Sequence, residues 1–252
     1  MPKVNFKKAD KFTIRRMINH GGKLVKDKMV KHKKLIEDTF NTEVKFIDHQ
    51  KMETEWIVFS NETHVYKSWT EDNVMGKLET KELNYFFEYH NSKLLEDWKL
   101  IPPFGCIQKQ RKVPGQPLRY LTRQEREQID LQKFSNWWIK EQLHIHEVGI
   151  QLSKVYPKFK MPSSKNSIKK ENYIFCFGDL NNENIMIDYK TNTYNFVDFQ
   201  PIGWVPLGHY QCLSDAYLFL ALEKIAQEPV QKYLDYASKQ LLKRLTNVNK
   251  DI

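Results

Sequence analysis

The most informative stretch of the sequence is residues 177–200, which read Phe-Gly-Asp-Leu-Asn-Asn-Glu-Asn-Ile-Met-Ile-Asp-Tyr-Lys-Thr-Asn-Thr-Tyr-Asn-Phe-Val-Asp-Phe-Gln. Two apolar runs, 185–187 and 194–197, flank a polar stretch at 188–193. Apolar runs separated by a short polar segment that can turn are typical of two paired strands. The pattern therefore predicts a β-hairpin.

The predicted hairpin brings oxygen-bearing side chains together at its open end. Asn184 and Asp198 lie equally far from Thr191 along the chain, so a hairpin folded about Thr191 places them side by side. Asp179 lies shortly before Asn184, on the loop that feeds the first strand. Carboxylate and carboxamide oxygens suit Mg²⁺, which binds through one or two protein groups plus substrate phosphates. Asp and Asn also cap turns, but the combination of a Gly-Asp loop, an apolar hairpin and a second Asp favours a functional site.

The segments around this stretch predict a β-rich part followed by a helical part, and hence an α+β fold. Strands are predicted at 44–47, 56–60, 64–69 and 105–113, with a turn at 61–63 and a helix at 78–97. Further on, 123–156 predicts a long helix or a helix pair, and 214–245 predicts two helices broken near Pro229. The predicted segments are a basic helical N-terminal extension, 1–43, a small β-rich lobe, 44–113, and a larger helical lobe, 114–252.

The net charge of the 252-residue chain is +9, from 40 basic and 31 acidic residues. Such a surface favours anionic ligands, including nucleotides, phosphorylated substrates, nucleic acid and acidic proteins. The basic residues concentrate in 1–34, where only Asp10 and Asp27 oppose them. This segment indicates either a contact for an acidic partner or a solvated helix packed on its apolar edge.

The sequence also bears on location. Its first residues lack the apolar core of a signal peptide, and no apolar run is long enough to cross a bilayer, so no membrane partner is expected. The three cysteines, Cys106, Cys176 and Cys212, are scattered along the chain. Because they form no disulfide framework or zinc motif, we expect a reducing cytoplasm.

The motif Gly178-Asp179-Leu180, followed by Asn184-Ile185 and then by 197–200, resembles the catalytic and metal loops of the protein-kinase-like superfamily. Gly-Asp in the first loop and Asp-Phe-Gln in the second are closest to the aminoglycoside phosphotransferase, choline kinase and ecdysteroid-kinase-like branch. The resemblance implies a bilobal protein-kinase-like fold, with nucleotide bound by the small lobe and catalysis in the helical lobe.

The resemblance also implies roles for individual residues. Asp179 corresponds to the catalytic base that orients or deprotonates the acceptor hydroxyl. Asn184 and Asp198 correspond to the ligands of the Mg²⁺ ions that bridge the ATP phosphates.

Further roles follow for the small lobe and the connection between the lobes. Lys67, on the third predicted strand, corresponds to the lysine that binds the ATP phosphates, and Glu82, on the next helix, to its glutamate partner. Lys112 and Val113 lie in the stretch that resembles the interlobe hinge, where backbone groups receive adenine. Asp215 resembles the structural aspartate of the helical lobe.

The sequence departs from the family pattern in three respects. Phe177 stands where the family usually has His, 48–54 contains no glycine, and the chain is short for the branch. The favoured function is an ATP-dependent phosphotransferase that transfers the γ-phosphate to a hydroxyl acceptor, with a small molecule preferred. The alternatives are a protein Ser/Thr kinase and a pseudokinase or regulatory binding module that uses the basic N-terminal segment.

Overall fold

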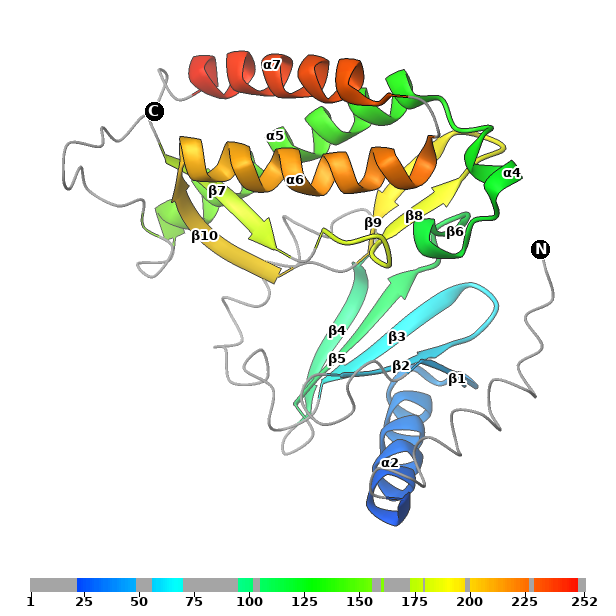
Figure 1. Cartoon of the computed structure of the whole chain (residues 1–252). Helices are drawn as coiled ribbons and strands as arrows, with labels where there is room; N and C mark the ends of the chain where they lie inside the picture. The colour runs from blue at the N-terminus through cyan, green and yellow to red at the C-terminus, as the bar shows by residue number, and fades with distance from the viewer. Residues whose placement is uncertain are drawn as a thin grey trace. The chain divides into compact units, whose positions relative to one another are not determined.

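A computed structural model of the chain separates it into two compact units (Figure 1). The first unit comprises 1–87 and 91–112, and the second comprises 88–90 and 113–252. The residues that the structure describes are 22–48, 56–69, 95–101, 105–155, 160, 173–178, 180–197, 200–226 and 229–248.

A five-stranded antiparallel sheet lies at the centre of the first unit, with strand order β1-β2-β3-β5-β4. The strands are β1 (Lys45–Asp48), β2 (Trp56–Ser60), β3 (His64–Trp69), β4 (Leu95–Ile101) and β5 (Gly105–Arg111). β2 and β3 are rich in the β-branched and aromatic residues that suit a pleated surface. In the turn between them, Asn61 Oδ1 accepts hydrogen bonds from the N–H groups of Thr63 and His64, at 3.0 and 2.8 Å.

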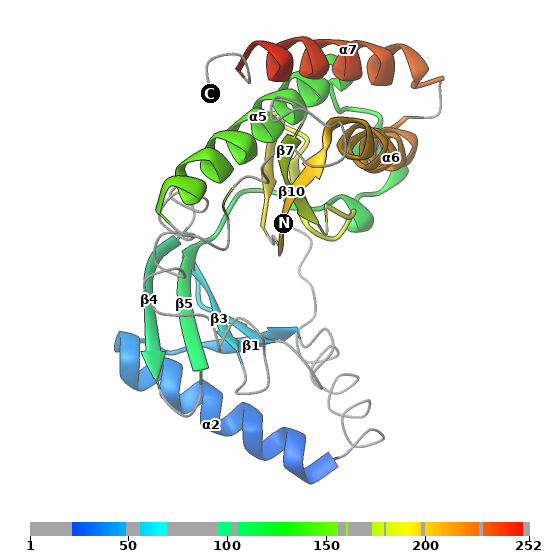
Figure 2. The same ribbon diagram turned by 90° about the vertical axis from the view of Figure 1, so that its left-hand side faces the viewer.

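Helix α2 (Gly22–Phe40) packs against one face of this sheet (Figure 2). Ile36 is fully buried in a cluster with apolar side chains of the sheet, namely Ile57, Phe59, Tyr66 and Ile107. One polar contact joins the helix to β3, where His32 Nδ1 lies 2.5 Å from Ser68 Oγ. The division at residue 43 stays a prediction about domain organisation, but α2 contributes to the core of the first unit.

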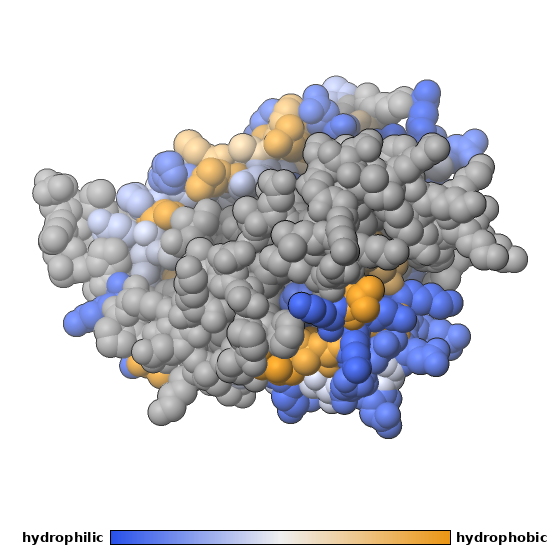
Figure 3. All heavy atoms as spheres, turned by 90° about the horizontal axis from the view of Figure 1, so that it is seen from below, coloured by the Kyte–Doolittle hydropathy of each residue, from blue (hydrophilic) through white to orange (hydrophobic). Residues whose placement is uncertain are grey.

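The outer side of α2 is basic. Val30 is 60% exposed, and the neighbouring lysines Lys31, Lys33 and Lys34 are also exposed. Seen from below, hydrophobic atoms lie beside hydrophilic ones on this side of the molecule (Figure 3). α2 is therefore amphipathic, with its apolar edge buried against the sheet and its basic edge in solvent.

The second unit combines helices with two small sheets. Its helices are η2 (Leu118–Tyr120), α4 (Arg123–Arg126), α5 (Leu131–Val155), α6 (Leu207–Ile225) and α7 (Gln231–Val248). One sheet pairs β7 (Tyr173–Gly178) with β10 (Gln200–Pro206), and the other contains β6 (Gln116–Pro117), β8 (Ile185–Asp188) and β9 (Thr193–Phe196). Trp138 and Phe134 of α5 are fully buried and pack with the β8–β9 hairpin in the main apolar cluster.

Gly115 fixes the start of the second unit against β8. Its φ of +91° lies in the left-handed region that side chains rarely adopt, and a Cβ there would lie 2.2 Å from the backbone carbonyl of Ile187. Only glycine permits both this backbone conformation and so close an approach. The segment from Gly115 into β6 is therefore held on the β8–β9 hairpin.

The predicted α+β class is confirmed, and β2 and β3 have their predicted bounds. The 123–156 segment is a helix pair, α4 and α5, and the tail also contains two helices. The predicted helix at 78–97 is wrong at its end, because residues 95–97 belong to β4; 78–94 lies outside the described residues. Pairing with β5 decides this segment, since its mixture of apolar and charged residues suits either structure locally.

None of the helices in the described ranges has the length and apolar character needed to cross a membrane.

Candidate functional site

The β8–β9 hairpin predicted from residues 177–200 is confirmed, with a register shifted by one residue. Ile185 is paired with Phe196 and Asp188 with Thr193, and the Val197 N–H donates to the Asn184 carbonyl at 3.0 Å. Asn184 therefore lies across from Val197. The prediction that the hairpin folds symmetrically about Thr191 is wrong by this one step, because the turn is centred between residues 190 and 191.

Asn184 is held in place by the turn that precedes β8. Its N–H donates to the Asn181 carbonyl at 3.0 Å, and the Asn181 Oδ1 accepts from the Glu183 N–H at 2.8 Å. Asparagine favours such turns because its side chain bonds to the backbone two residues further on. Leu180 on one side and Ile185 on the other are buried in the apolar cluster. With both backbone groups paired and the residue only 9% exposed, Asn184 has a fixed position.

A second element braces the same turn from outside. The Arg119 N–H donates to the Asn182 carbonyl at 3.1 Å, and the Arg119 guanidinium forms an ion pair with Glu183. Arg119 belongs to η2, which follows directly on β6. The turn before Asn184 and the segment that begins at Gly115 thus form one connected structure.

The two predicted carboxylates, Asp179 and Asp198, lie outside the described residues. The strands that flank them are described, and Gly178 of β7 is paired with Gln200 of β10. Across the ranges the structure describes, no group of three or more His, Cys, Asp or Glu side chains could hold a metal ion. The assignment of Asp179 as base and of Asp198 as metal ligand stays a prediction.

Lys67 lies on the face of the sheet opposite α2. Successive residues of a strand point to opposite faces, and Tyr66 and Ser68 face α2. Lys67 is paired with Val58 of β2 and with Gln108 of β5. It is only 6% exposed, which is uncommon for lysine unless the charge has a polar or ionic environment. Its predicted partner Glu82 lies outside the described residues.

Two glutamines beside Lys67 were missed in the sequence. Gln108 and Gln110 are 1% and 5% exposed, and the Gln110 Nε2 donates to the Gln108 Oε1 at 2.8 Å. An alternating strand such as 107–111 normally indicates that its polar residues face solvent. The register of β3 with β5 places Gln108 and Gln110 on the same face as Lys67, and no local pattern in the sequence indicates that register.

Lys112 is bound to the β2–β3 turn. Its N–H donates to the Thr63 carbonyl at 3.0 Å, and its ammonium donates to the Asn61 carbonyl. Its backbone donor is thus already paired within the first unit. Val113 begins the second unit and is half-buried. Adenine recognition by the backbone of Lys112 and Val113 stays a prediction, to which Lys112 would contribute its carbonyl rather than its N–H.

Asp215 connects two helices of the second unit. Its Oδ1 accepts hydrogen bonds from Gln211 Nε2 at 2.8 Å within α6 and from the Ser238 hydroxyl of α7. These contacts agree with a structural role for Asp215.

An ionic cluster lies on the strands that lead to Lys112. Glu96 of β4 contacts Arg111 at 2.7 Å, Lys109 at 3.2 Å and His64 at 2.7 Å. Hydrogen bonds from Arg111, then Lys109, lower the pKa of Glu96 to about 2. Its carboxylate thus stays ionised throughout the neutral and mildly acidic range and ties β4 to β3 and β5.

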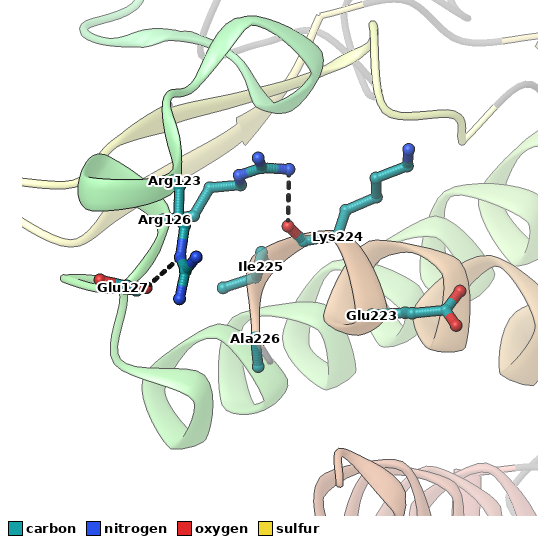
Figure 4. A pocket seen from close by; sticks show the side chains of 7 residues that line it. All are labelled: Arg123, Arg126, Glu127, Glu223, Lys224, Ile225 and Ala226. Carbon is teal, nitrogen blue, oxygen red and sulfur yellow. Dashed lines mark hydrogen bonds and ion pairs between the residues drawn. The ribbon is translucent and has the colours of Figure 1, made fainter. Parts of the chain in front are cut away.

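Two adjoining surface pockets lie between α4 and the end of α6, of about 290 and 490 Å³. In the smaller one, the Arg126 guanidinium donates to the Lys224 carbonyl at 3.0 Å and Arg123 pairs with Glu127 at 2.9 Å (Figure 4). Among the predicted site residues that the structure describes, none lines either pocket.

Neither a family model nor any curated protein matches the sequence. Solved structures do match. An aminoglycoside phosphotransferase of Streptomyces rimosus, APH(3'')-Id, is 14% identical, with 87% of this chain and 92% of that chain covered and a TM-score of 0.48. The same enzyme in complex with ADP and streptomycin gives 15% identity, 75% and 85% coverage and a TM-score of 0.43.

A further match is spectinomycin phosphotransferase, APH(9)-Ia, in complex with ADP and spectinomycin, at 12% identity, 87% and 85% coverage and a TM-score of 0.39. All are aminoglycoside phosphotransferases. The likeness runs over most of the chain and is to the branch that the 178–200 motif resembles. A likeness at this level assigns neither an activity nor a substrate, so the residues of this chain have to carry the functional argument.

Proposed function

We propose that the chain is an ATP-dependent phosphotransferase that transfers the γ-phosphate of ATP to a hydroxyl group of a small molecule. The observation that carries this proposal is the position of Asn184. Its backbone is paired on both sides, its side chain is nearly buried, and it stands within the Gly-Asp-x4-Asn motif followed by Asp-Phe-Gln. A residue whose backbone is fixed in this way is suited to present its carboxamide to a metal–nucleotide complex.

The residues of the motif have the donor chemistry for Mg²⁺. Asn184 and Asp198 supply a carboxamide and a carboxylate oxygen, which are the hard ligands that Mg²⁺ requires. When bound, Mg²⁺ neutralises charge on the phosphates of ATP. In the proposal, Asn184 and Asp198 hold the ion, and Lys67 adds a positive charge to the phosphate chain.

In the proposed reaction, Asp179 orients the acceptor hydroxyl toward the γ-phosphorus. The acceptor oxygen forms a bond to phosphorus while the bond between the γ-phosphorus and the β,γ-bridging oxygen breaks, and ADP leaves with that electron pair. The hydroxyl proton passes to the Asp179 carboxylate and then to solvent. Positioning and charge neutralisation supply most of the rate enhancement in this class of reaction.

The first test is a thermal-shift titration of the full chain with ATP, with and without Mg²⁺. A nucleotide that binds only the folded state raises Tm, and the stabilisation grows with the logarithm of 1 + [ATP]/Kd. We expect stabilisation that requires Mg²⁺ and is lost in Asp198→Ala. Asp188→Ala is the matched control, because Asp188 lies at the turn end of the same hairpin and bonds only to the turn residues Lys190 and Thr191 in the described contacts.

Turnover is tested separately, as ADP released in the presence of hydroxyl-bearing small molecules, including aminoglycosides. Asp179→Asn should lower turnover by orders of magnitude and leave the affinity for Mg-ATP nearly unchanged. Full activity in Asp198→Ala would refute the site assignment. A cytoplasmic location, where ATP is available and thiols stay reduced, is part of the same proposal.

A regulatory binding module is the second candidate. The observation that favours it is the exposed basic edge of α2, with Lys31, Lys33 and Lys34 in solvent, together with a 48–54 segment that lacks glycine. No Tm shift at millimolar Mg-ATP would favour this candidate. Binding of an acidic protein that is lost when the three lysines are changed to Gln would then establish it.

A further inference from the structure

The face of the five-stranded sheet that carries Lys67 is polar and yet buried. Ser60, Lys67, Gln108 and Gln110 are all at most 9% exposed. The register aligns them in two cross-strand rows, with Lys67 beside Gln108 and Val65 beside Gln110. Burying polar side chains is unfavourable unless they find hydrogen-bond partners, so the hydrogen bonds of this face need to be accounted for.

The Gln108 carboxamide is oriented by its neighbour. Its Oε1 accepts from the Gln110 Nε2 at 2.8 Å. With Gln110 in this orientation, turning the Gln108 amide over would bring two NH₂ groups face to face. The Nε2 of Gln108 is buried and has no hydrogen-bond partner in the structure of the described chain. A buried donor without an acceptor typically destabilises a fold.

What distinguishes this donor from other buried amides is its place beside Lys67, where an acceptor from a ligand would satisfy it. Lys67 lies directly across from Gln108 in the neighbouring strand, where opposed side chains stand within contact distance. An ammonium next to an amide donor favours an anionic oxygen over a cation or an apolar group. At 1% exposure, the Gln108 amide is shielded from bulk solvent.

We propose that Gln108 is a phosphate-binding residue of the nucleotide site, in which its Nε2 donates a hydrogen bond to the same phosphate chain that Lys67 binds. Gln110 acts through Gln108 as a positioning residue, because its Nε2 holds the amide in the donating orientation. This inference rests on the proposed function and extends it to two residues that the 178–200 motif does not contain.

The test is isothermal titration of the full-length protein with Mg-ATP and, separately, with adenosine. In Gln108→Met, a side chain of similar size replaces the amide and the donor is lost. We expect Kd for Mg-ATP to rise roughly ten- to hundredfold, as for a lost hydrogen bond to a charged group, while Kd for adenosine stays the same. Gln108→Glu keeps the acceptor for Gln110 and serves as the second variant, with a still weaker affinity for Mg-ATP.

A double-mutant cycle with Gln110→Met tests the positioning role. If Gln110 acts only by orienting Gln108, Gln110→Met weakens Mg-ATP binding in the wild-type background and has no added effect in Gln108→Met. Additive effects would overturn the positioning role. An unchanged Kd for Mg-ATP in Gln108→Met, or an equal loss for adenosine, would overturn the assignment of Gln108 to the phosphates.

Gln142 offers a matched control in the second unit. It is also buried, its Oε1 accepts from the Tyr210 hydroxyl at 2.7 Å, and its Nε2 likewise has no partner in the described structure. Gln142→Met should change Tm without changing Kd for Mg-ATP. If the wild-type protein binds Mg-ATP and Gln108→Met binds it equally well, this inference alone fails; if the wild-type protein does not bind Mg-ATP, the proposed function fails and this inference with it.

Discussion

The two faces of the five-stranded sheet are buried to a similar extent but differ in chemistry. On the α2 face, Ile57, Phe59, Tyr66 and Ile107 form an apolar cluster around Ile36. On the opposite face, the buried positions include a lysine and two glutamines. The first face is explained by the transfer of apolar surface out of water. The second gains little from that effect, so its residues point to interactions other than core packing.

We therefore expect the two faces of this sheet to serve different purposes, one the stability of the fold and the other ligand binding. Changes on the α2 face should act mainly on unfolding, and changes on the Lys67 face mainly on ligand affinity. Four substitutions test that separation, and they are arranged from the largest expected effect to the smallest.

Phe59→Ala should have the largest effect on stability. Phe59 is 1% exposed and contacts Phe46 with ring centroids 5.8 Å apart. Truncating a buried phenylalanine costs about 3–5 kcal/mol, because it loses apolar contacts and leaves a cavity. Chemical unfolding measures this loss. Under conditions where the variant stays folded, its Kd for Mg-ATP should match the wild-type value, and a large rise in Kd would mean that the two faces are coupled.

Lys67→Met, in contrast to Phe59→Ala, should act mainly on the interaction with ATP. In the proposed function Lys67 binds phosphate, so its removal is expected to lower kcat/KM for ATP about a hundredfold, which corresponds to about 2.7 kcal/mol of transition-state stabilisation. Any change in stability is read separately, because a group that interacts with Lys67 loses that partner in the variant. Steady-state kinetics and chemical unfolding on the same preparation measure both quantities. A variant that unfolds easily but keeps its kcat/KM would assign Lys67 to the core.

The His32–Ser68 pair is the polar exception on the α2 face. His32→Leu leaves the buried Ser68 hydroxyl without this partner, which should destabilise the fold by about 1–3 kcal/mol. Adding Ser68→Ala should restore part of that loss, because both polar groups are then gone. A double-mutant cycle measured by chemical unfolding reports the coupling. Strict additivity would show that the 2.5 Å contact contributes nothing.

Glu96→Gln should have the smallest effect. Exposed ion pairs contribute at most about 1 kcal/mol, and this one weakens further at high salt. Because neighbouring Arg111 and Lys109 lower the pKa of Glu96 from 4.5 to about 2, its contribution is fully present above about pH 4.5 and is lost as pH falls through about 2. The Tm difference between wild type and variant should shrink over that window. A difference that stays constant down to pH 2 would contradict the lowered pKa.

Much of the fold follows from local sequence. β2 and β3 were predicted with their bounds because β-branched and aromatic residues alternate between clear turn residues. The β8–β9 hairpin was predicted for the same reason, but its register was not. Asn192 adopts a φ of +50°. The conformation of such a turn sets which residues of the two strands pair, and the apolar pattern of the sequence does not reveal a shift of one residue.

The candidate site was only partly predictable. Asn184 was identified because a motif contains it, whereas Gln108 and Gln110 belong to no motif. Alternation in β5 gives two faces but does not say which face is covered, since that depends on segments far away in the sequence. The strand β4 was missed for a related reason, because its pairing with β5 outweighs the helical pattern of the residues before it.

The nesting of the strands in the second unit bears on how this unit folds. The β8–β9 hairpin lies entirely within the segment that connects β7 to β10. Forming the hairpin first shortens the loop that β7 and β10 have to close, and local contacts form faster than distant ones. We therefore expect the pairing of Gly178 with Gln200, which joins β7 to β10, to form after the β8–β9 hairpin. Asp179 and Asp198 stand in the sequence between these strand pairs, so we expect the proposed phosphotransferase activity to be the last property that a refolding chain regains.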